Sequence, residues 1–250
     1  MRNPKGVIAY LLLAFGIAWI TWQVPIQLGV PASSPLFQLY ILPGAFSPAI
    51  AALLVRVFGK EGFADAGLKL NFRHWPYFVF ALLLPVAVVG AILLQVEASG
   101  LGHADFTLAT AIKALAGRAL PANTPAYVGL LIIPQLLFTA ILTTPVLWGE
   151  EFGWRGYLQP RLFPGKPLLA ALATGPIWAV WHYPLIFRGY DFGDQALPGA
   201  AVMLVSCTLV SYIFAWLVER TGSIWSSSLA HAATNGVGGS LTLLWFAGLK

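Results

Sequence analysis

Charged residues are scarce in this sequence of 250 residues, where they make up 9%, whereas hydrophobic residues make up 58%. Soluble domains carry about 25% charged residues. The scarcity excludes an ordinary water-soluble domain and indicates that much of the surface faces lipid. Cysteine is nearly absent too, because Cys207 is the only one, which excludes an intramolecular disulfide. Its place in an apolar run favours a small buried hydrophobic side chain.

The sequence contains repeated long apolar runs. They are long enough to cross a bilayer, which takes roughly 20 residues. The first run has the basic flank of a signal peptide, but it is too long, so we expect a retained span. The sequence predicts an all-α fold, a polytopic integral membrane helical bundle with about seven to eight transmembrane helices, in one transmembrane domain over residues 1–250. A stretch near 106–120 is too short and polar to span and predicts an interfacial helix. The predicted spans lie near 7–24, 38–58, 76–96, 127–148, 167–187, 199–218 and 223–247.

Basic residues in short loops predict the orientation of the chain in the cell membrane, because they favour the cytoplasmic side. If the N-terminus is cytoplasmic, the same side receives most of the 14 Lys and Arg residues. This topology explains the net charge of +5. No basic patch interleaved with aromatic residues is present, so we expect no nucleic-acid partner. The end of the fourth predicted span is then also cytoplasmic.

Two adjacent glutamates, Glu150 and Glu151, follow the apolar run 127–148 in the stretch GEEFGWRGYLQPRL. They could simply end the span at the headgroups, but the residues around them stay apolar and aromatic, which indicates that the helix continues. Glu151 precedes Arg155 by four positions, the favoured order for an ion pair on a helix. No ion pair of this kind explains why Glu150 lies at this position. A carboxylate in apolar surroundings binds protons more readily, which suits a general base.

Histidines lie in two later predicted spans, as His182 and His231. A histidine within a span is a candidate functional residue, although it can also serve as a polar contact between helices. His231 and Asn235 are four positions apart, so on one helix face they offer two donors to an oxyanion. Trp178 precedes His182 by the same spacing and either packs on the imidazole or belongs to the core.

Three ordered motifs, EEFGWR, WAVWH and HAATN, resemble those of the CPBP family. This family comprises the CAAX-protease and bacteriocin-processing membrane proteins, including Rce1-type prenyl-protein endopeptidases. Its pattern is two glutamates followed by Arg, an aromatic residue ahead of His, and His followed by Asn or Asp. The second motif usually opens with Phe, where this sequence has Trp178. The resemblance covers residues 147–236, within a motif-bearing core near 127–247.

The resemblance implies an intramembrane endopeptidase with a site towards the cytoplasm. It would hydrolyse a peptide bond in a membrane-embedded or lipidated, CAAX-like protein or peptide. The resemblance assigns the water-activating role to Glu150, with His182 holding the water. It assigns the oxyanion hole to His231 and Asn235. A supporting role falls to Glu151, Arg155 and Trp178.

A metal is an open alternative, because Glu150, His182 and His231 could supply the ligands of a catalytic Zn²⁺ or another divalent ion. The sequence has no HExxH motif and no two histidines four positions apart. If His231 serves the oxyanion hole, too few ligands remain. The pattern therefore slightly favours a metal-free mechanism, and no cofactor is predicted with certainty.

Two functions from other classes remain open. A membrane transporter could use the same Glu and His residues to relay protons. Such transporters often contain internal repeats, and this sequence has none. The second alternative is a non-catalytic bacteriocin-immunity or binding protein, against which the intact catalytic positions argue.

Overall fold

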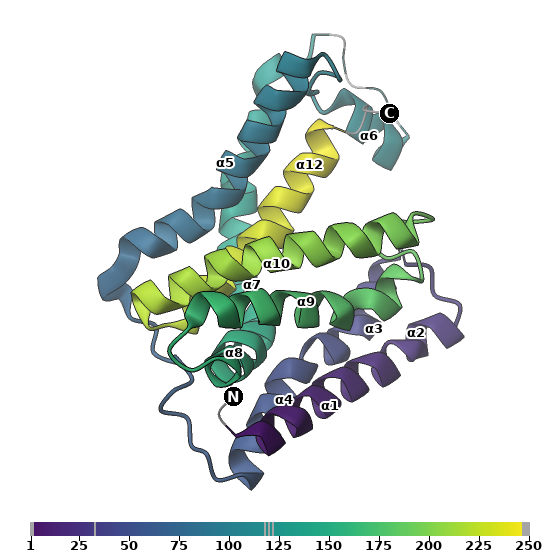
Figure 1. Ribbon diagram of the computed structural model, residues 1–250. Coiled ribbons are helices and arrows are strands. Elements are labelled where there is room, and N and C mark those ends of the chain that lie inside the picture. The colour runs from purple at the N-terminus through teal and green to yellow at the C-terminus, as the bar shows by residue number, and fades with distance from the viewer. Residues whose placement is uncertain (1–2, 33, 118, 120, 122, 247–250) are drawn as a thin grey trace. The chain divides into compact units, whose positions relative to one another are not determined.

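The regular structure of the chain is entirely helical in the part that the computed structural model describes, residues 3–32, 34–117, 119, 121 and 123–246 (Figure 1). The predicted all-α fold is confirmed. The longer helices are α1 (Pro4–Thr21), α4 (Ser47–Phe58), α5 (Trp75–Ser99), α7 (Ile132–Gly153), α9 (Pro167–Ile186) and α10 (Ala196–Thr221). The shorter ones are α2 (Gln23–Gln27), α3 (Pro35–Ala45), α6 (Ala109–Ala116), α8 (Gln159–Leu162), α11 (Ile224–Ala233) and α12 (Gly239–Trp245).

Five helical stretches in the described residues are long and apolar enough to cross a membrane, which confirms a polytopic membrane bundle. The predicted segments 167–187 and 223–247 also form helices, α9 and α11 to α12. They are not among the five, because polar residues such as His182, His231 and the serines of α11 dilute their apolar character. Residues 118, 120 and 247 of the predicted segments lie outside the described residues. The five stretches are Pro4–Gln27, Pro35–Phe58, Phe72–Ser99, Tyr127–Leu162 and Ala196–Thr221.

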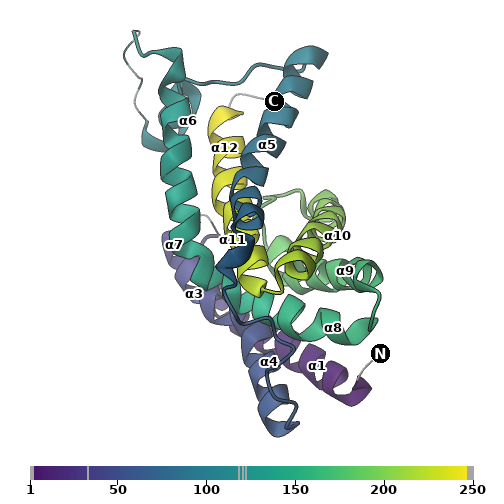
Figure 2. The ribbon, with the colours of Figure 1, turned by 90° about the vertical axis from the view of Figure 1, so that its left-hand side faces the viewer.

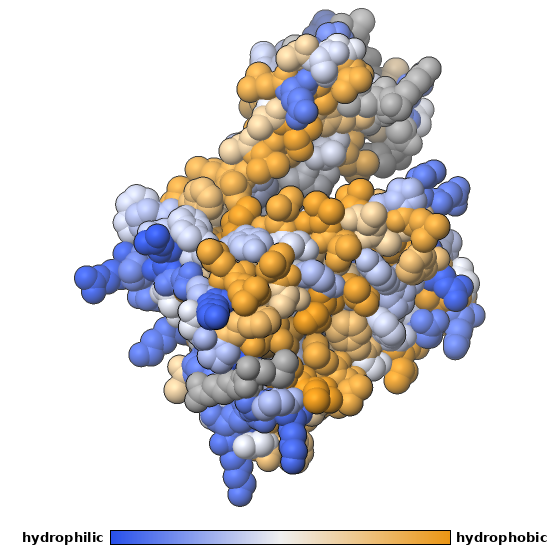
Figure 3. Space-filling view, in the orientation of Figure 1, coloured by the Kyte–Doolittle hydropathy of each residue, from blue (hydrophilic) through white to orange (hydrophobic). Residues whose placement is uncertain are grey.

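Two compact units make up the chain: Met1–Arg73 with Val146–Ser228, and His74–Pro145 with Leu229–Lys250. In the first unit α1 lies beside α4, and α9 beside α10, as Figures 1 and 2 both show. Large apolar side chains of α10, such as Val205 and Leu209, are exposed, and Figure 3 shows hydrophobic residues over α9 and α10. This outward-facing apolar surface suits contact with lipid. That residues 1–250 form one membrane domain stays a prediction.

Aromatic rings fill the interior of the first unit. The ring centroid of Trp181 on α9 lies 4.6 Å from that of Trp22 and 5.8 Å from that of Trp154. Tyr10 on α1 lies 5.9 Å from Trp154 and 4.9 Å from Tyr157. These separations fall in the favourable range for aromatic pairs, about 4.5–7 Å. The rings join α1, α9 and the segment after α7 into one core.

The second unit is held by contacts of α12 with α5 and α6. The backbone N–H of Asp105 donates to the carbonyl oxygen of Trp245 at 2.8 Å, and the ring of Phe106 lies 5.1 Å from that of Trp245. A Cβ added at Gly238 would lie 3.5 Å from Pro85, so α5 passes close to the chain just before α12. The stretch predicted as interfacial is helical as α6, and its position at a membrane surface stays a prediction.

Small residues set the distance between α9 and α10. A Cβ added at Gly175 would lie 2.5 Å from the Cα atom of Thr208 and 3.0 Å from the carbonyl oxygen of Cys207. Both atoms belong to backbone, which has little freedom to move. Small residues at helix interfaces allow this kind of approach in membrane proteins. Gly175 therefore fixes how closely the helix that carries Trp178 and His182 packs against α10.

We expect Gly175→Ala to destabilise the protein by about 1–3 kcal/mol, the usual range for an overpacked interior. The extra methyl group must push α9 away from the α10 backbone. The measurement is the unfolding midpoint in detergent, with Gly16→Ala as the matched control, because a Cβ at Gly16 meets no atom within 4 Å. Equal midpoints for the two variants would contradict this account of the α9–α10 contact.

Candidate active site

The two glutamates lie in the last turn of α7, immediately before a π-helical segment, η3 (Trp154–Leu158). The side chains are buried, with Glu150 8% and Glu151 0% exposed. The predicted continuation of the helix past the glutamates is confirmed, because the helical stretch reaches Leu162. π-helical turns within α-helices are frequent at functional sites. A Cβ added at Gly153 would lie 2.3 Å from Pro48, so α4 packs tightly beside the motif.

Glu150 accepts a hydrogen bond from α9. The indole Nε1–H of Trp178 donates to Glu150 Oε2 at 2.9 Å. The sequence pattern brought Trp178 into the site only as a ring that packs on an imidazole or in the core. Its ring centroid does lie 5.8 Å from that of His182, but its hydrogen bond to the carboxylate was missed. The sequence did carry a signal for this bond, because tryptophan has an N–H donor and the Phe that the family usually has at this position does not.

Glu151 and Arg155 form the predicted ion pair, with Arg155 Nη1 donating to Glu151 Oε1 at 2.9 Å. Neither side chain is exposed to solvent. Arg155 Nη2 donates to the hydroxyl of Ser211 on α10, also at 2.9 Å. The central guanidinium carbon lies 4.6 Å from the ring centre of Trp178 and 4.9 Å from that of Phe214. The buried cation thus contacts a carboxylate, a hydroxyl and two aromatic faces, while its Nε has no hydrogen-bond partner among the described residues.

Sequence reasoning missed Ser211 and Phe214 as members of this cluster. Both lie on α10, both are buried, and neither belongs to a motif. Serine and phenylalanine are ordinary in an apolar span, so their types carried no signal. Only the packing of α10 against α9 identifies them.

His182 is oriented by its own helix. Its Nδ1 lies 2.9 Å from the carbonyl oxygen of Trp178. Because a carbonyl only accepts hydrogen bonds, Nδ1 must carry the hydrogen, and in the neutral ring Nε2 then bears the lone pair. The ring also contacts Trp181, with centroids 4.8 Å apart. Half-buried on α9, His182 presents Nε2 as an acceptor.

His231 and Asn235 belong to the second unit and are described within it. His231 lies on α11 and is 3% exposed, whereas Asn235 is exposed. The structure differs from the expected regular helix, because α11 ends at Ala233 and a π-helical segment, η4 (Thr234–Gly238), follows. The wider π turn changes the angle between residues four positions apart, so the spacing alone does not place the two side chains on one face.

Comparisons with known proteins show where the three motifs belong. The model of the family described as type II CAAX prenyl endopeptidase Rce1-like matches residues 126–237. The chain is also 26% identical, over 249 aligned residues, to CAAX prenyl protease 2 of Methanococcus maripaludis, covering 93% of this chain and 83% of that protein. Over these residues the chain resembles the Rce1-like CAAX prenyl endopeptidases. The predictions of a protease and of a multi-pass membrane protein are confirmed with it.

The metal alternative stays a prediction, because its ligands Glu150 and His182 belong to the first unit and His231 belongs to the second. Within the described residues, no three His, Cys, Asp or Glu side chains gather as a metal site would require. The bonds of His182 Nδ1 to a carbonyl oxygen and of Glu150 Oε2 to Trp178 are of the kind that orients metal ligands, so they do not count against a metal. Glu150, His182 and His231 stay a predicted ligand set, and no step of the reaction is derived through a metal.

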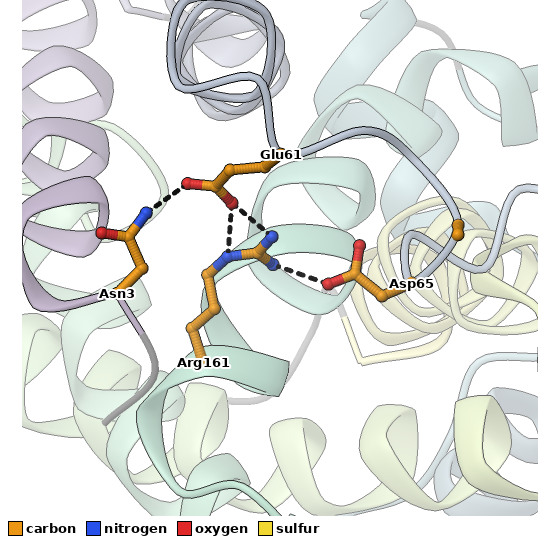
Figure 4. Close-up of a pocket in the computed structure, with 5 residues that line it drawn as sticks. Asn3, Glu61, Asp65 and Arg161 are labelled. Carbon is orange, nitrogen blue, oxygen red and sulfur yellow. Dashed lines mark hydrogen bonds and ion pairs between the residues drawn. The ribbon is translucent and has the colours of Figure 1, made fainter.

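A second charged cluster, outside the three motifs, lies at a pocket of about 250 Å³ in the first unit (Figure 4). Arg161 donates to Glu61 Oε2 through Nε at 3.0 Å and Nη2 at 2.5 Å, and its Nη1 lies 3.2 Å from Asp65 Oδ2. The amide of Asn3 also donates to Glu61. Sequence reasoning did not identify this cluster. The cluster ties the N-terminus and the loop after α4 to α8.

Arg56 connects this cluster to the glutamate motif. It is 1% exposed and donates to Asp65 Oδ1 at 2.7 Å and to the carbonyl oxygen of Gly62 at 2.6 Å. Its Nη2 donates to the carbonyl oxygen of Gly156 in η3 at 2.6 Å. A π-helical turn leaves backbone groups poorly paired, and here a buried guanidinium takes up one of its carbonyls. Arg56 thus helps hold the turn that follows Glu150 and Glu151.

Removing one partner of the buried ion pair should be far more harmful than removing both. Arg155→Leu leaves Glu151 buried without its cation, so we expect a loss of about 3–5 kcal/mol in the free energy of unfolding. The double variant Glu151→Gln, Arg155→Leu should recover most of that loss. The measurement is a double-mutant cycle by denaturant unfolding in detergent. A double variant as unstable as Arg155→Leu would contradict a direct pair.

Asp65 should make stability depend on pH. Partial burial raises the pKa of its carboxyl, but the hydrogen bond and charge of Arg56 outweigh burial and hold the pKa below its ordinary value of 3.8. A lowered folded-state pKa stabilises the fold above that value, and this stability is lost as pH falls below it. We expect wild type to unfold at a higher temperature than Asp65→Asn near neutral pH, and the difference to shrink below about pH 4. A difference that stays constant with pH would contradict this.

Proposed function

We propose that this chain cleaves a peptide bond near the lipidated C-terminus of a membrane-bound protein, with Glu150 as the general base. The observation that carries the proposal is the setting of Glu150: a buried carboxylate near the end of an apolar helix, oriented by Trp178. Its neighbour Glu151 pairs with Arg155 and so satisfies the cation. Glu150 is left to accept a proton from water.

The reaction needs one water and one proton carrier. Glu150 takes a proton from the water while the oxygen attacks the carbonyl carbon of the scissile bond, giving a tetrahedral intermediate with an oxyanion. When this intermediate collapses, the C–N bond breaks and the proton on Glu150 passes to the leaving amine. His182 holds the water through Nε2, the acceptor nitrogen that the bond from Nδ1 to Trp178 defines.

His231 and Asn235 are proposed as the donors that stabilise the oxyanion. Support comes from the motif order and from the family match, which spans both residues. A preorganised donor pair typically contributes more to such a reaction than any other group. The roles of Glu151 and Arg155 are to support the helix and balance the charge beside the base.

The substrate proposal follows the matching family and the relative from Methanococcus maripaludis, CAAX prenyl protease 2. We propose a prenylated or otherwise lipidated protein whose tail reaches the site from the bilayer. Because basic residues gather in loops on the side of the N-terminus, we place that terminus and the site towards the cytoplasm. A membrane-embedded peptide segment would present the same chemistry.

The test is cleavage of a farnesylated, internally quenched CAAX peptide by the purified protein in liposomes. Glu150→Gln should lower kcat by about 10²–10⁴-fold, the range for loss of general-base catalysis. Glu219→Gln on the exposed surface of α10 is the matched control and should cleave like wild type. Cleavage by Glu150→Gln at the wild-type rate would overturn the proposal.

A chelator arm of the same assay addresses the metal alternative. We expect o-phenanthroline and EDTA to leave kcat unchanged, because the proposed base is a carboxylate acting on water. Loss of cleavage on chelation, restored by added Zn²⁺, would return the mechanism to a metal-dependent one. An unlipidated peptide of the same sequence serves as the specificity control and should be cleaved more slowly.

A further inference from the structure

Trp178 occupies a position where the family pattern usually has Phe. The two aromatic side chains fill similar space, but only the indole has an N–H group, and here that group donates to Glu150 Oε2 at 2.9 Å. We propose that Trp178 is a positioning residue for the base: its hydrogen bond occupies Oε2 and directs Oε1 towards the water. This inference rests on the proposed function and adds a role that phenylalanine cannot perform.

The indole is itself packed against two further side chains, Arg155 and Phe214. Arg155 lies over the Trp178 ring with its guanidinium carbon 4.6 Å from the ring centre, and Phe214 lies near the ring with centroids 6.1 Å apart. The guanidinium is fixed in turn by Glu151 and Ser211. A donor on a ring that is packed in this way restricts the orientation of the carboxylate, and carboxylate orientation decides how well water is aligned for attack.

Backbone geometry links the same residue to the second group proposed to hold the water. The carbonyl oxygen of Trp178 accepts from Nδ1 of His182 at 2.9 Å. Trp178 therefore orients the carboxylate through its side chain and the imidazole through its main chain. One residue of α9 sets the angle between the base and its partner.

Pairing of a buried indole N–H is not automatic in this protein. The indole nitrogens of Trp148 and Trp154 are buried and have no hydrogen-bond partner among the described residues. Trp154 is fully buried in the aromatic core. Tryptophans of the core either leave the N–H unpaired within the described part of the chain, as Trp154 does, or donate to a backbone carbonyl, as Trp22 does to Ile41 at 2.9 Å. Trp178 instead donates to the carboxylate of the proposed base.

The decisive experiment replaces Trp178 by 3-benzothienylalanine, introduced at that single site, in the full-length protein in liposomes. Sulfur replaces the N–H group while the ring keeps nearly the same shape, so packing and the contact with Arg155 are retained. We expect kcat for the farnesylated peptide to fall about tenfold or more, with KM within about twofold of wild type. Trp178→Phe should lose kcat in the same direction.

The matched control is the same replacement at Trp154, whose N–H has no described partner. It should leave both kcat and KM unchanged. A readout independent of turnover is the antisymmetric carboxylate stretch of Glu150 in infrared difference spectra, assigned with Glu150→Gln. Loss of the indole N–H should shift this band, whereas the replacement at Trp154 should not.

The outcomes separate this inference from the function on which it rests. If Glu150→Gln is inactive while 3-benzothienylalanine at position 178 leaves kcat and the carboxylate band unchanged, the positioning role is wrong and the proposed function stands. A rise in KM at unchanged kcat would also overturn it, because it would place Trp178 in substrate binding. If Glu150→Gln cleaves like wild type, the proposed function itself fails.

Discussion

The buried guanidinium of Arg155 is the group on which the rest of the site depends. It joins its own helix to α9 and α10 through Glu151, Trp178, Ser211 and Phe214. A cation without partners in an apolar interior would be very unfavourable, so the surrounding groups can only adopt arrangements that satisfy it. The position of Trp178, and through it that of Glu150, follows from this requirement.

A second guanidinium applies the same constraint from the other side of the motif. Arg56 takes up the carbonyl of Gly156 and is neutralised by Asp65, which also contacts Arg161. The π-helical turn is therefore held by two buried guanidinium groups, that of Arg155 within the turn and that of Arg56 on the carbonyl of Gly156. In a chain with so few charged residues, a large share of the buried ones serves to hold this short stretch.

The sequence predicted those features that depend on local spacing. The apolar runs gave the helices, and the interval of four positions gave the ion pair of Glu151 and Arg155, because both follow from the regular α-helix. The contributions of Ser211 and Phe214 depend on which face of α10 meets α9, and no local pattern encodes that choice. The hydrogen bond from Trp178 required the same knowledge of two helices at once.

Irregular backbone limited the prediction in a different way. Reasoning from a period of 3.6 residues assumes that the helix keeps its phase, whereas η3 and η4 both interrupt it, and Asn235 falls inside such an interruption. The charged cluster of Asn3, Glu61, Asp65 and Arg161 was missed because it joins the N-terminal segment, a loop and a helix that are far apart in sequence, with no motif among them.

The π-helical turn after the glutamates also lets one continuous helix direct the side chains before and after the turn towards different neighbours. Each residue of an α-helix advances the direction of its side chain by about 100°, and a π turn accommodates one extra residue. The side chains beyond η3 therefore point in directions that are rotated by about 100° from those of an uninterrupted α7. Glu150 and Glu151 can face α9 and α10 while Arg161, on the same axis, faces the loop after α4. A deletion of one residue within 154–158 would restore a regular helix and turn either the glutamates or Arg161 away from its partners, so this stretch should tolerate substitution better than any change in length.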